Sequence, residues 1–170
     1  MKKLQWGMIG GGEGSQIGPA HRLGSGLDGL FEFSAGALDH RPEEGIDYGK
    51  RLGLGDRAYG SWQEMLAAEK NRDDKIDLVT VATPNSTHFE ITKEFLEGGF
   101  NVLCEKPIAV SNGEFELMVF SAKENKVLLM EAMWTKFLPV TKLIRETVES
   151  NKLGKFKKAY LEFGANITGL

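Results

Sequence analysis

The sequence predicts an α/β protein built on a doubly wound parallel sheet, and two observations carry this prediction. First, short apolar runs recur at regular intervals, and runs that are apolar throughout suit strands covered on both faces. Second, helical patterns with short connections lie between these runs, which is typical of right-handed strand–helix–strand crossovers. The expected strands are residues 4–9, 31–38, 76–82, 100–104 and 127–130.

The first two expected helices each follow one of the first two strands. Residues 17–27 form a helical pattern directly after a glycine-rich segment. Residues 45–52 form the next pattern, and they follow Pro42 and the acidic pair Glu43 and Glu44, which suit the first turn of a helix. The first pattern therefore links the first two strands, and the second is followed by a further helical pattern ahead of the third strand.

Capping signals mark the start of two further helices. Ser61 opens SWQEML, whose capping-box spacing predicts a helix over residues 62–70. Ser86 or Thr87 caps the pattern HFEITKEFLE, which ends at the glycine pair that follows it. The remaining helical patterns are residues 112–124 and 140–150.

Composition and charge restrict the class of protein. The chain has 170 residues, of which 41% are hydrophobic and 26% charged, which suits one globular domain or slightly more. The net charge of -3, without a basic block, argues against nucleic acid as a partner. Cys104 is the single cysteine and cannot form an internal disulfide, and no segment reaches the roughly 18 apolar residues that cross a membrane. With no signal-peptide pattern at the N-terminus, we expect a cytoplasmic protein.

The segment IGGGEGSQIGPAH joins the first expected strand to the first helix. A phosphate-binding turn needs this order, because glycines let the backbone approach a pyrophosphate and the helix N-terminus faces its charge. The spacing departs from GxGxxG: after Gly10 and Gly12, either Ser15 takes the third position or an expanded loop gives it to Gly18. We expect the expanded loop, because the proline that follows suits a helix first turn, and we expect Glu13 to point to solvent. A strand-to-helix loop without a ligand is the alternative.

Asp39 ends the second expected strand and tests the dinucleotide interpretation. An acid about 20 residues beyond the glycines can hydrogen-bond a ribose 2′-hydroxyl, which favours NAD. His40 and Arg41 follow it, and a cation beside the ribose can take a 2′-phosphate, so NADP stays open. A turn-forming aspartate ahead of Pro42 is the structural alternative.

Two further motifs stand at the carboxyl ends of expected strands, where open α/β sheets bind ligands. They are VATPNSTHFE, from Val81, and NVLCEKPIAV, from Asn101. With the glycine loop, ATPNxxH and EKP in this order, the chain resembles the Gfo/Idh/MocA family of NAD(P)-dependent oxidoreductases, whose substrates are mostly sugars and polyols. The resemblance spans essentially the whole chain and implies a Rossmann domain. Its tail is similar to the dihydrodiol dehydrogenase branch, whereas its head is similar to a different branch.

The resemblance also implies a set of site residues. Lys106 would lie near the nicotinamide and the substrate and act in catalysis. Apart from the resemblance, the aromatic residues Trp134 and Phe137 are candidates to border a substrate pocket. No metal is expected. The residues expected to contact the cofactor are Gly10, Gly12, Ile17, Gly18, Asp39, His40, Arg41, Ala82, Thr83, Pro84, Asn85, His88, Glu105, Lys106 and Pro107.

Lys106 has a chemical reason to be catalytic. An ammonium beside a reacting hydroxyl can donate a hydrogen bond, stabilise developing alkoxide charge and help to move the proton as the hydride leaves. Pro107 removes an N–H group and fixes φ, so the turn is stiff. The structural alternatives are a solvated lysine for Lys106, a plain first-turn residue for His88, core packing for Trp134 and a packing thiol for Cys104.

We expect two parts in the chain. Residues 1–132 would form the dinucleotide-binding domain, and residues 133–170 the truncated start of a second α/β domain for substrate and oligomerisation. The segment KFKKAYLEFGANI alternates like an antiparallel strand over residues 156–163, and a lone edge strand favours a homo-oligomer. A cut fragment, a natural truncation and a recombined protein are the origins left open.

Together these patterns predict an oxidoreductase that transfers a hydride between a nicotinamide cofactor and a sugar, polyol or related hydroxyl substrate. Because the family's second domain supplies most substrate contacts, we expect the chain alone to be nearly inactive. The alternative is a non-catalytic dinucleotide-binding module with a sensor or regulatory role.

Overall fold

The structure is a computed structural model that describes residues 2–155, 157–160 and 162. Five strands form one parallel sheet in the order β2-β1-β3-β4-β5. Their bounds are Leu4–Gly10 for β1, Phe31–Ala37 for β2, Leu78–Ala82 for β3, Asn101–Cys104 for β4 and Leu129–Glu131 for β5. The predicted parallel α/β sheet is therefore confirmed.

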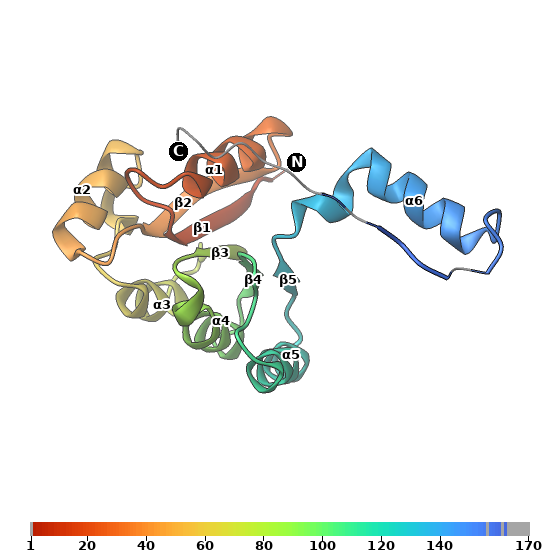
Figure 1. Cartoon of the computed structure of the whole chain (residues 1–170). Helices are drawn as coiled ribbons and strands as arrows, with labels where there is room; N and C mark the ends of the chain where they lie inside the picture. Colours follow the sequence, from red (N-terminus) through yellow and green to blue (C-terminus); the bar gives the residue numbers. More distant parts are fainter. Residues whose placement is uncertain (1, 156, 161, 163–170) are drawn as a thin grey trace. The chain divides into compact units, whose positions relative to one another are not determined.

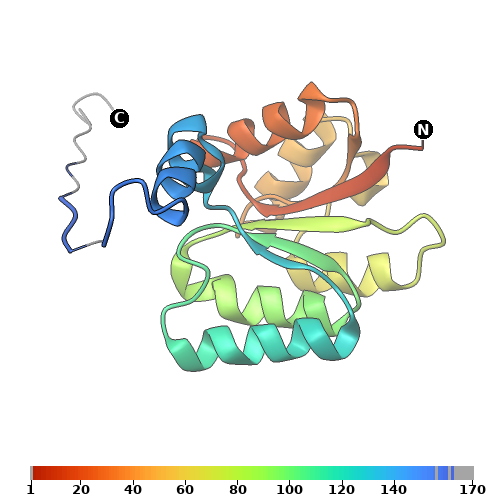
Figure 2. The same cartoon turned by 90° about the vertical axis from the view of Figure 1, so that its right-hand side faces the viewer.

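Helices cover both faces of this sheet, as Figures 1 and 2 show. Helices α1 (Ile17–Leu27) and α2 (Pro42–Arg51) lie on one face, and α3 (Trp62–Lys70), α4 (His88–Glu97) and α5 (Asn112–Asn125) lie on the other. Two hydrophobic clusters match these faces: Met8 belongs to one, and Ile9, the next residue of β1, belongs to the other. Apolar residues in succession along a strand are therefore needed here, because both faces are covered.

The sheet has a residual strand beside β2. Ala58, after the short helix η1 (Gly55–Arg57), pairs with Gly36 as an isolated parallel bridge, and the N–H of Tyr59 donates to the Gly36 carbonyl at 2.8 Å. Counted as a third strand, this bridge completes the strand order of doubly wound dinucleotide-binding folds. The strands that follow β1 are added first on one side of it and then, from β3 onward, on the other side. Such folds bind ligands at this switch point between β1 and β3.

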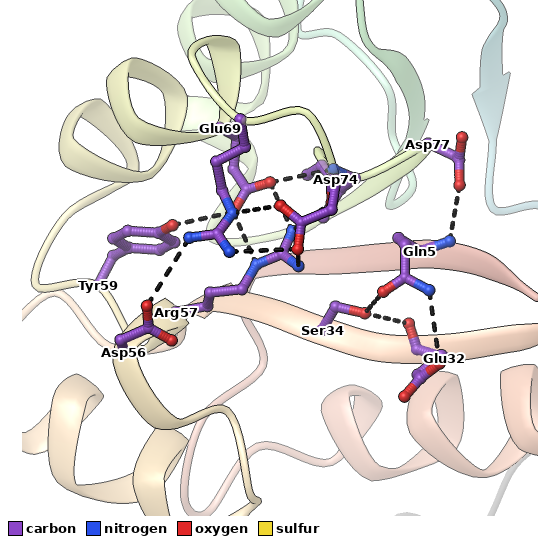
Figure 3. A network of polar contacts seen from close by, with 11 residues as sticks. Gln5, Glu32, Ser34, Asp56, Arg57, Tyr59, Glu69, Asp74 and Asp77 are labelled. Carbon is purple, nitrogen blue, oxygen red and sulfur yellow. Dashed lines mark hydrogen bonds and ion pairs between the residues drawn. The ribbon is translucent and has the colours of Figure 1, made fainter.

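A buried ion pair holds the residual strand to α3 (Figure 3). The Glu69 side chain is fully buried and accepts hydrogen bonds from Arg57 at 2.7 and 3.0 Å. Glu69 also accepts from the Tyr59 hydroxyl at 2.9 Å and from the N–H of Ile76 at 3.0 Å. Burial and the contact with Glu69 raise the pKa of Tyr59 to about 12. This cluster fixes the chain just before residues 60–63 and just before β3.

Three strands begin later than their apolar runs. Ile76, Phe100 and Val127 precede β3, β4 and β5, yet all three pack into the larger core. Their N–H groups donate to the Glu69 carboxylate, the Phe95 carbonyl and the Ala122 carbonyl, and so to the preceding helix in each case. These three residues are therefore apolar because their side chains pack into the core, although their backbone does not pair with a neighbouring strand.

Helix starts follow the expected chemistry with one shift. The Ser61 hydroxyl accepts from the N–H of Glu64 at 3.2 Å, which confirms the predicted cap of α3. Helix α2 begins at Pro42, three residues before the expected start, so its acidic pair forms the first turn. Thr87 is the N-cap residue of α4, without a side-chain cap bond, after the short helix η2 (Asn85–Thr87).

The chain divides into two compact units, Met1–Ala132 and Met133–Leu170. The second unit contains η3 (Trp134–Phe137) and α6 (Pro139–Glu149). The strand expected over residues 156–163 includes Phe156, Leu161 and Phe163, which lie outside the described residues, while residues 157–160 have neither helix nor strand. The homo-oligomer that rests on this strand stays a prediction. No helix among the described residues is long and apolar enough to cross a membrane.

Candidate functional site

The glycine loop packs against the ends of two strands and the first turn of α1. Gly10 ends β1 with a φ of 74°, a backbone conformation that glycine adopts without strain. A Cβ atom at Gly12 would overlap the carbonyl oxygen of Leu38, at the end of β2. A Cβ atom at Gly18 would overlap the carbonyl oxygen of Gly11, so helix and loop touch here. Of the two alternatives for the third glycine, the structure places this close contact at Gly18.

Ser15, the other alternative, has a local capping contact. Its hydroxyl accepts from the N–H of Gly18 at 3.1 Å, which satisfies one of the free donors at the start of α1. The inserted Glu13 points outward: its carboxylate is exposed and receives two hydrogen bonds from Arg51, at 2.6 and 3.0 Å. These bonds hold the pKa of Glu13 below its usual range. The predicted solvent-facing position of Glu13 is confirmed, with an arginine partner that the sequence pattern did not indicate.

Gly18 and Gly24 provide a matched pair of substitutions on α1. We expect Gly18→Ala to lower the free energy of unfolding by about 1–3 kcal/mol, because the added methyl group meets backbone that must move. Gly24 has open space around it, so Gly24→Ala is expected to raise that free energy by about 0.5–1 kcal/mol. Urea unfolding of the two variants measures both values. Equal stabilities would contradict the close contact at Gly18.

A groove of about 820 Å³ opens at the carboxyl ends of β1, β2 and β3. Its volume lies within the usual range for small-molecule and cofactor sites, about 300–1,000 Å³. Seven of the predicted contact residues line it: Gly10, Gly12, Asp39, His40, Ala82, Thr83 and Pro84. Eight others do not: Ile17, Gly18, Arg41, Asn85, His88, Glu105, Lys106 and Pro107. The groove therefore combines the glycine loop with Asp39 and the start of the ATPN motif.

Residues 60–63 form a wall of the groove that the sequence analysis missed. Ser61 gave only a helix-start signal, and Trp62 was expected only as the first helical residue. The residual strand at Ala58 brings these residues to the groove, because it extends the sheet beyond β2. A single bridge leaves no periodic pattern in the sequence, so no local signal could have found this wall.

Asp39 is a carboxylate held by its neighbours in the chain. One oxygen, Oδ1, accepts from the backbone N–H of Arg41 at 2.9 Å and from its Nε at 3.2 Å. These two bonds lower the pKa of Asp39, with a smaller contribution from the charge of His40. Arg41 also pairs with Glu44 on α2. Both Asp39 and Arg41 are therefore charged at neutral pH, and each already has an opposite charge beside it.

His88 lies behind the groove and supports two turns. Its side chain is fully buried, with Nε2 at 2.8 Å from the Thr83 carbonyl and Nδ1 at 2.8 Å from the Pro107 carbonyl. Both ring nitrogens are thus occupied by backbone, and the ring does not line the groove. His88 therefore contacts backbone of both turns, and its contact with a cofactor stays a prediction.

Lys106 is exposed to solvent, whereas Cys104 is buried. Lys106 is exposed at a turn whose Lys106–Pro107 peptide is cis, and within the described part of the chain its Nζ atom has no hydrogen bond or ion pair. Cys104 is fully buried in β4, and burial raises the pKa of its thiol to about 11. A protonated, buried thiol is a poor nucleophile, which supports the packing role.

Trp134 belongs to the second unit. It starts η3 and is 59% exposed, so it is not part of a core within the described residues. Phe137, at the other end of η3, is 64% exposed. The described residues contain no group of three His, Cys, Asp or Glu side chains that could hold a metal ion.

The fold and the groove together define a class of protein. A parallel sheet of this order, a glycine loop between the first strand and its helix, and an acid at the end of the second strand are the features of a Rossmann-type dinucleotide-binding domain. Residues 4–133 match the Gfo/Idh/MocA family, described as an oxidoreductase family with an NAD-binding Rossmann fold. The chain belongs to this family, as the motifs predicted.

Relatives of known name agree with this assignment. The oxidoreductase YfiI of Bacillus subtilis is 43% identical over 130 residues, which cover 75% of this chain and 33% of that protein. The NADP-dependent D-xylose 1-dehydrogenase of Hypocrea jecorina is 38% identical over 110 residues, which cover 65% of this chain and 27% of that protein. The chain thus spans about a third of the length of the curated relatives it matches.

Solved structures show the same similarity in three dimensions. An inositol dehydrogenase homologue from Azotobacter vinelandii, solved with NADH and myo-inositol, has a TM-score of 0.87 and 35% identity. The match covers 91% of this chain and 41% of that one. An oxidoreductase from Pseudomonas syringae matches with a TM-score of 0.86 and 34% identity, over 90% of this chain and 42% of that one.

Proposed function

We propose that this chain is the cofactor-binding part of an oxidoreductase that transfers a hydride between NAD and a hydroxyl-bearing carbon of a sugar or polyol. One observation carries the proposal: the groove is lined by the glycine loop that leads into α1 and by the Asp39 carboxylate after β2, the places where a dinucleotide's pyrophosphate and ribose are bound in such folds. Family membership and relatives named for xylose and inositol support the substrate class.

Two further features of the groove support a dinucleotide. The glycine loop packs closely on the end of β2, because Gly12 leaves no room for a Cβ atom beside the Leu38 carbonyl, and α1 begins directly after this loop with its N-terminus available to phosphate charge. Asp39 keeps its second oxygen, Oδ2, without a hydrogen bond in the described part of the chain, and this oxygen can accept from a ribose hydroxyl. When bound, the nicotinamide ring supplies the hydride chemistry.

Lys106 would supply the proton chemistry in this proposal. Its ammonium is exposed and not engaged elsewhere in the described residues, so it can donate to a substrate hydroxyl and stabilise alkoxide charge as it develops. A module that only binds the dinucleotide would not need an exposed lysine whose ammonium has no other partner among the described residues. The exposure of Lys106 therefore favours an enzyme over the sensor alternative.

Asp39 and Arg41 favour NAD over NADP. The Asp39 carboxylate would repel a 2′-phosphate, and Arg41 is already neutralised by Asp39 and Glu44. We expect Asp39→Ala to weaken NADH binding about tenfold or more, since it removes a hydrogen bond to a charged group. The same change frees Arg41 from one of its two carboxylate partners and removes the charge that repels a 2′-phosphate, so it should strengthen NADPH binding. Asp73→Ala, at an exposed aspartate, is the matched control and should change neither affinity.

Titration of the purified chain with NADH and NADPH, followed by protein and nicotinamide fluorescence, tests the proposal. The expected result is saturable binding with a preference for NADH. The proposal fails when neither cofactor binds at millimolar concentration. An unchanged NADH-to-NADPH preference in Asp39→Ala would remove Asp39 from cofactor selection but leave dinucleotide binding in place.

A further inference from the structure

Lys106 lies in a turn whose other residues are all held by side chains from elsewhere in the fold. The turn consists of residues 105–108, between β4 and the start of α5. We propose that His21 is a positioning residue for Lys106, which it holds through Glu105 and so ties to the dinucleotide-binding helix α1. This role rests on the proposed function of Lys106.

The contact between His21 and Glu105 is the centre of this inference. His21 Nε2 lies 2.8 Å from Glu105 Oε1, and both side chains are largely buried. The other oxygen of Glu105, Oε2, accepts from the backbone N–H of Lys106 at 3.1 Å. A buried carboxylate is costly without partners, and within the described residues His21 is its only side-chain partner. The Glu105 carboxylate therefore links His21 to the backbone of Lys106 through two hydrogen bonds.

The far side of the turn is held in the same manner. The Pro107 carbonyl lies 2.8 Å from the ring of His88 on α4, and the N–H of Ile108 donates to the Glu131 carboxylate on β5 at 3.0 Å. Three elements thus fix the backbone on both sides of Lys106, while the lysine side chain extends to solvent. Such support reduces the positional spread of a reacting group, which catalysis requires.

His21 differs from the other two supports because of its place on α1. It lies one turn after Gly18, whose close contact with Gly11 sets the helix against the glycine loop. The Glu105 N–H also donates to the Val81 carbonyl on β3 at 2.9 Å, next to the groove-lining Ala82. A ligand that orders the glycine loop and the start of α1 therefore also orders His21, and through Glu105 it orders the turn of Lys106.

Hydrogen exchange at the backbone amides of Glu105, Lys106 and Ile108 tests this role. In the chain without cofactor, His21→Leu is expected to speed this exchange about tenfold, because a hydrogen bond to a charged group is lost. His21→Gln should stay close to the native rate, since its amide N–H can reach Glu105. His21→Asn is polar but too short, so it should behave like His21→Leu. Leu23→Ala, at an exposed position on α1, is the control and should leave the rates unchanged.

Addition of NADH extends the test. In the native chain and in His21→Gln, saturating NADH should slow exchange at these amides further, whereas in His21→Leu and His21→Asn this slowing should be lost. Amide exchange in β1 and β3 at the same rate as in the native chain verifies that each variant is folded. Unchanged exchange at the turn in both His21→Leu and His21→Asn, or failure of His21→Gln to restore it, overturns the inference. Absence of NADH binding to the native chain would instead refute the proposed function, and the comparison without cofactor would still decide on His21.

Discussion

Replacing Glu69 with alanine is expected to lower the free energy of unfolding by about 3–5 kcal/mol. The substitution removes the buried carboxylate partner of Arg57, whose side chain is only 8% exposed, and leaves it only the more distant and exposed Asp74 carboxylate at 3.6 Å. It also removes the acceptor for Tyr59 and for the N–H of Ile76 (Figure 3). Urea unfolding followed by circular dichroism measures the change. Loss of the residual strand at Ala58 should accompany it and widen the groove at residues 60–63.

Glu13→Ala is the matched control for this prediction. Glu13 forms a bidentate pair with Arg51, as Glu69 does with Arg57, but the Glu13 pair is exposed to solvent. Exposed ion pairs add little to stability, so we expect no measurable change in unfolding. Equal effects of Glu69→Ala and Glu13→Ala would contradict the central place of the buried pair in holding the fold.

Replacing Lys106 with methionine is expected to reduce hydride transfer by a factor of about 10² to 10⁴. Methionine is unbranched and only one atom shorter than lysine, but it cannot donate a proton or stabilise an alkoxide. Since Lys106 is exposed and lies outside the groove lining, the affinity for NADH should change by less than a factor of about two, which is well under the 1.4 kcal/mol that a tenfold change in affinity represents. Because the chain alone is expected to be nearly inactive, the rate is measured in a protein that joins this chain to a complete substrate domain, by nicotinamide absorbance with a panel of sugars and polyols.

Lys123→Met, on the exposed side of α5, controls for the loss of a surface charge. This variant should turn over substrates at the native rate. Equal rates in Lys106→Met and the native protein would remove Lys106 from the mechanism and favour the sensor alternative.

The fold was predictable because each strand and helix has a local signal. Apolar runs covered on both faces indicated a parallel sheet, and Ser61 marked the start of α3 correctly. Strand boundaries were less accurate, since Ile76 and Phe100 are apolar for packing while their N–H groups bond to helices or their side chains. The strand expected over residues 156–163 stays a prediction.

The groove was predictable where its lining coincides with strand ends, as at Gly10 and Asp39. It was not predictable where a contact joins distant segments. His21 and Glu105 are 84 residues apart, and neither has a neighbour in the sequence that indicates the other. His88 carried a motif signal, but its burial between two carbonyl groups follows only from how α4 packs behind the turns.

A crystal structure of the protein with NADH bound tests the proposed cofactor site most directly. We expect the pyrophosphate against Gly10 and Gly12 ahead of α1, the adenosine ribose on Asp39, and the nicotinamide ring on the side of Lys106. A structure at saturating NADH without cofactor in the groove would contradict this expectation. So would a dinucleotide bound in the reverse direction, with its adenine beside Lys106.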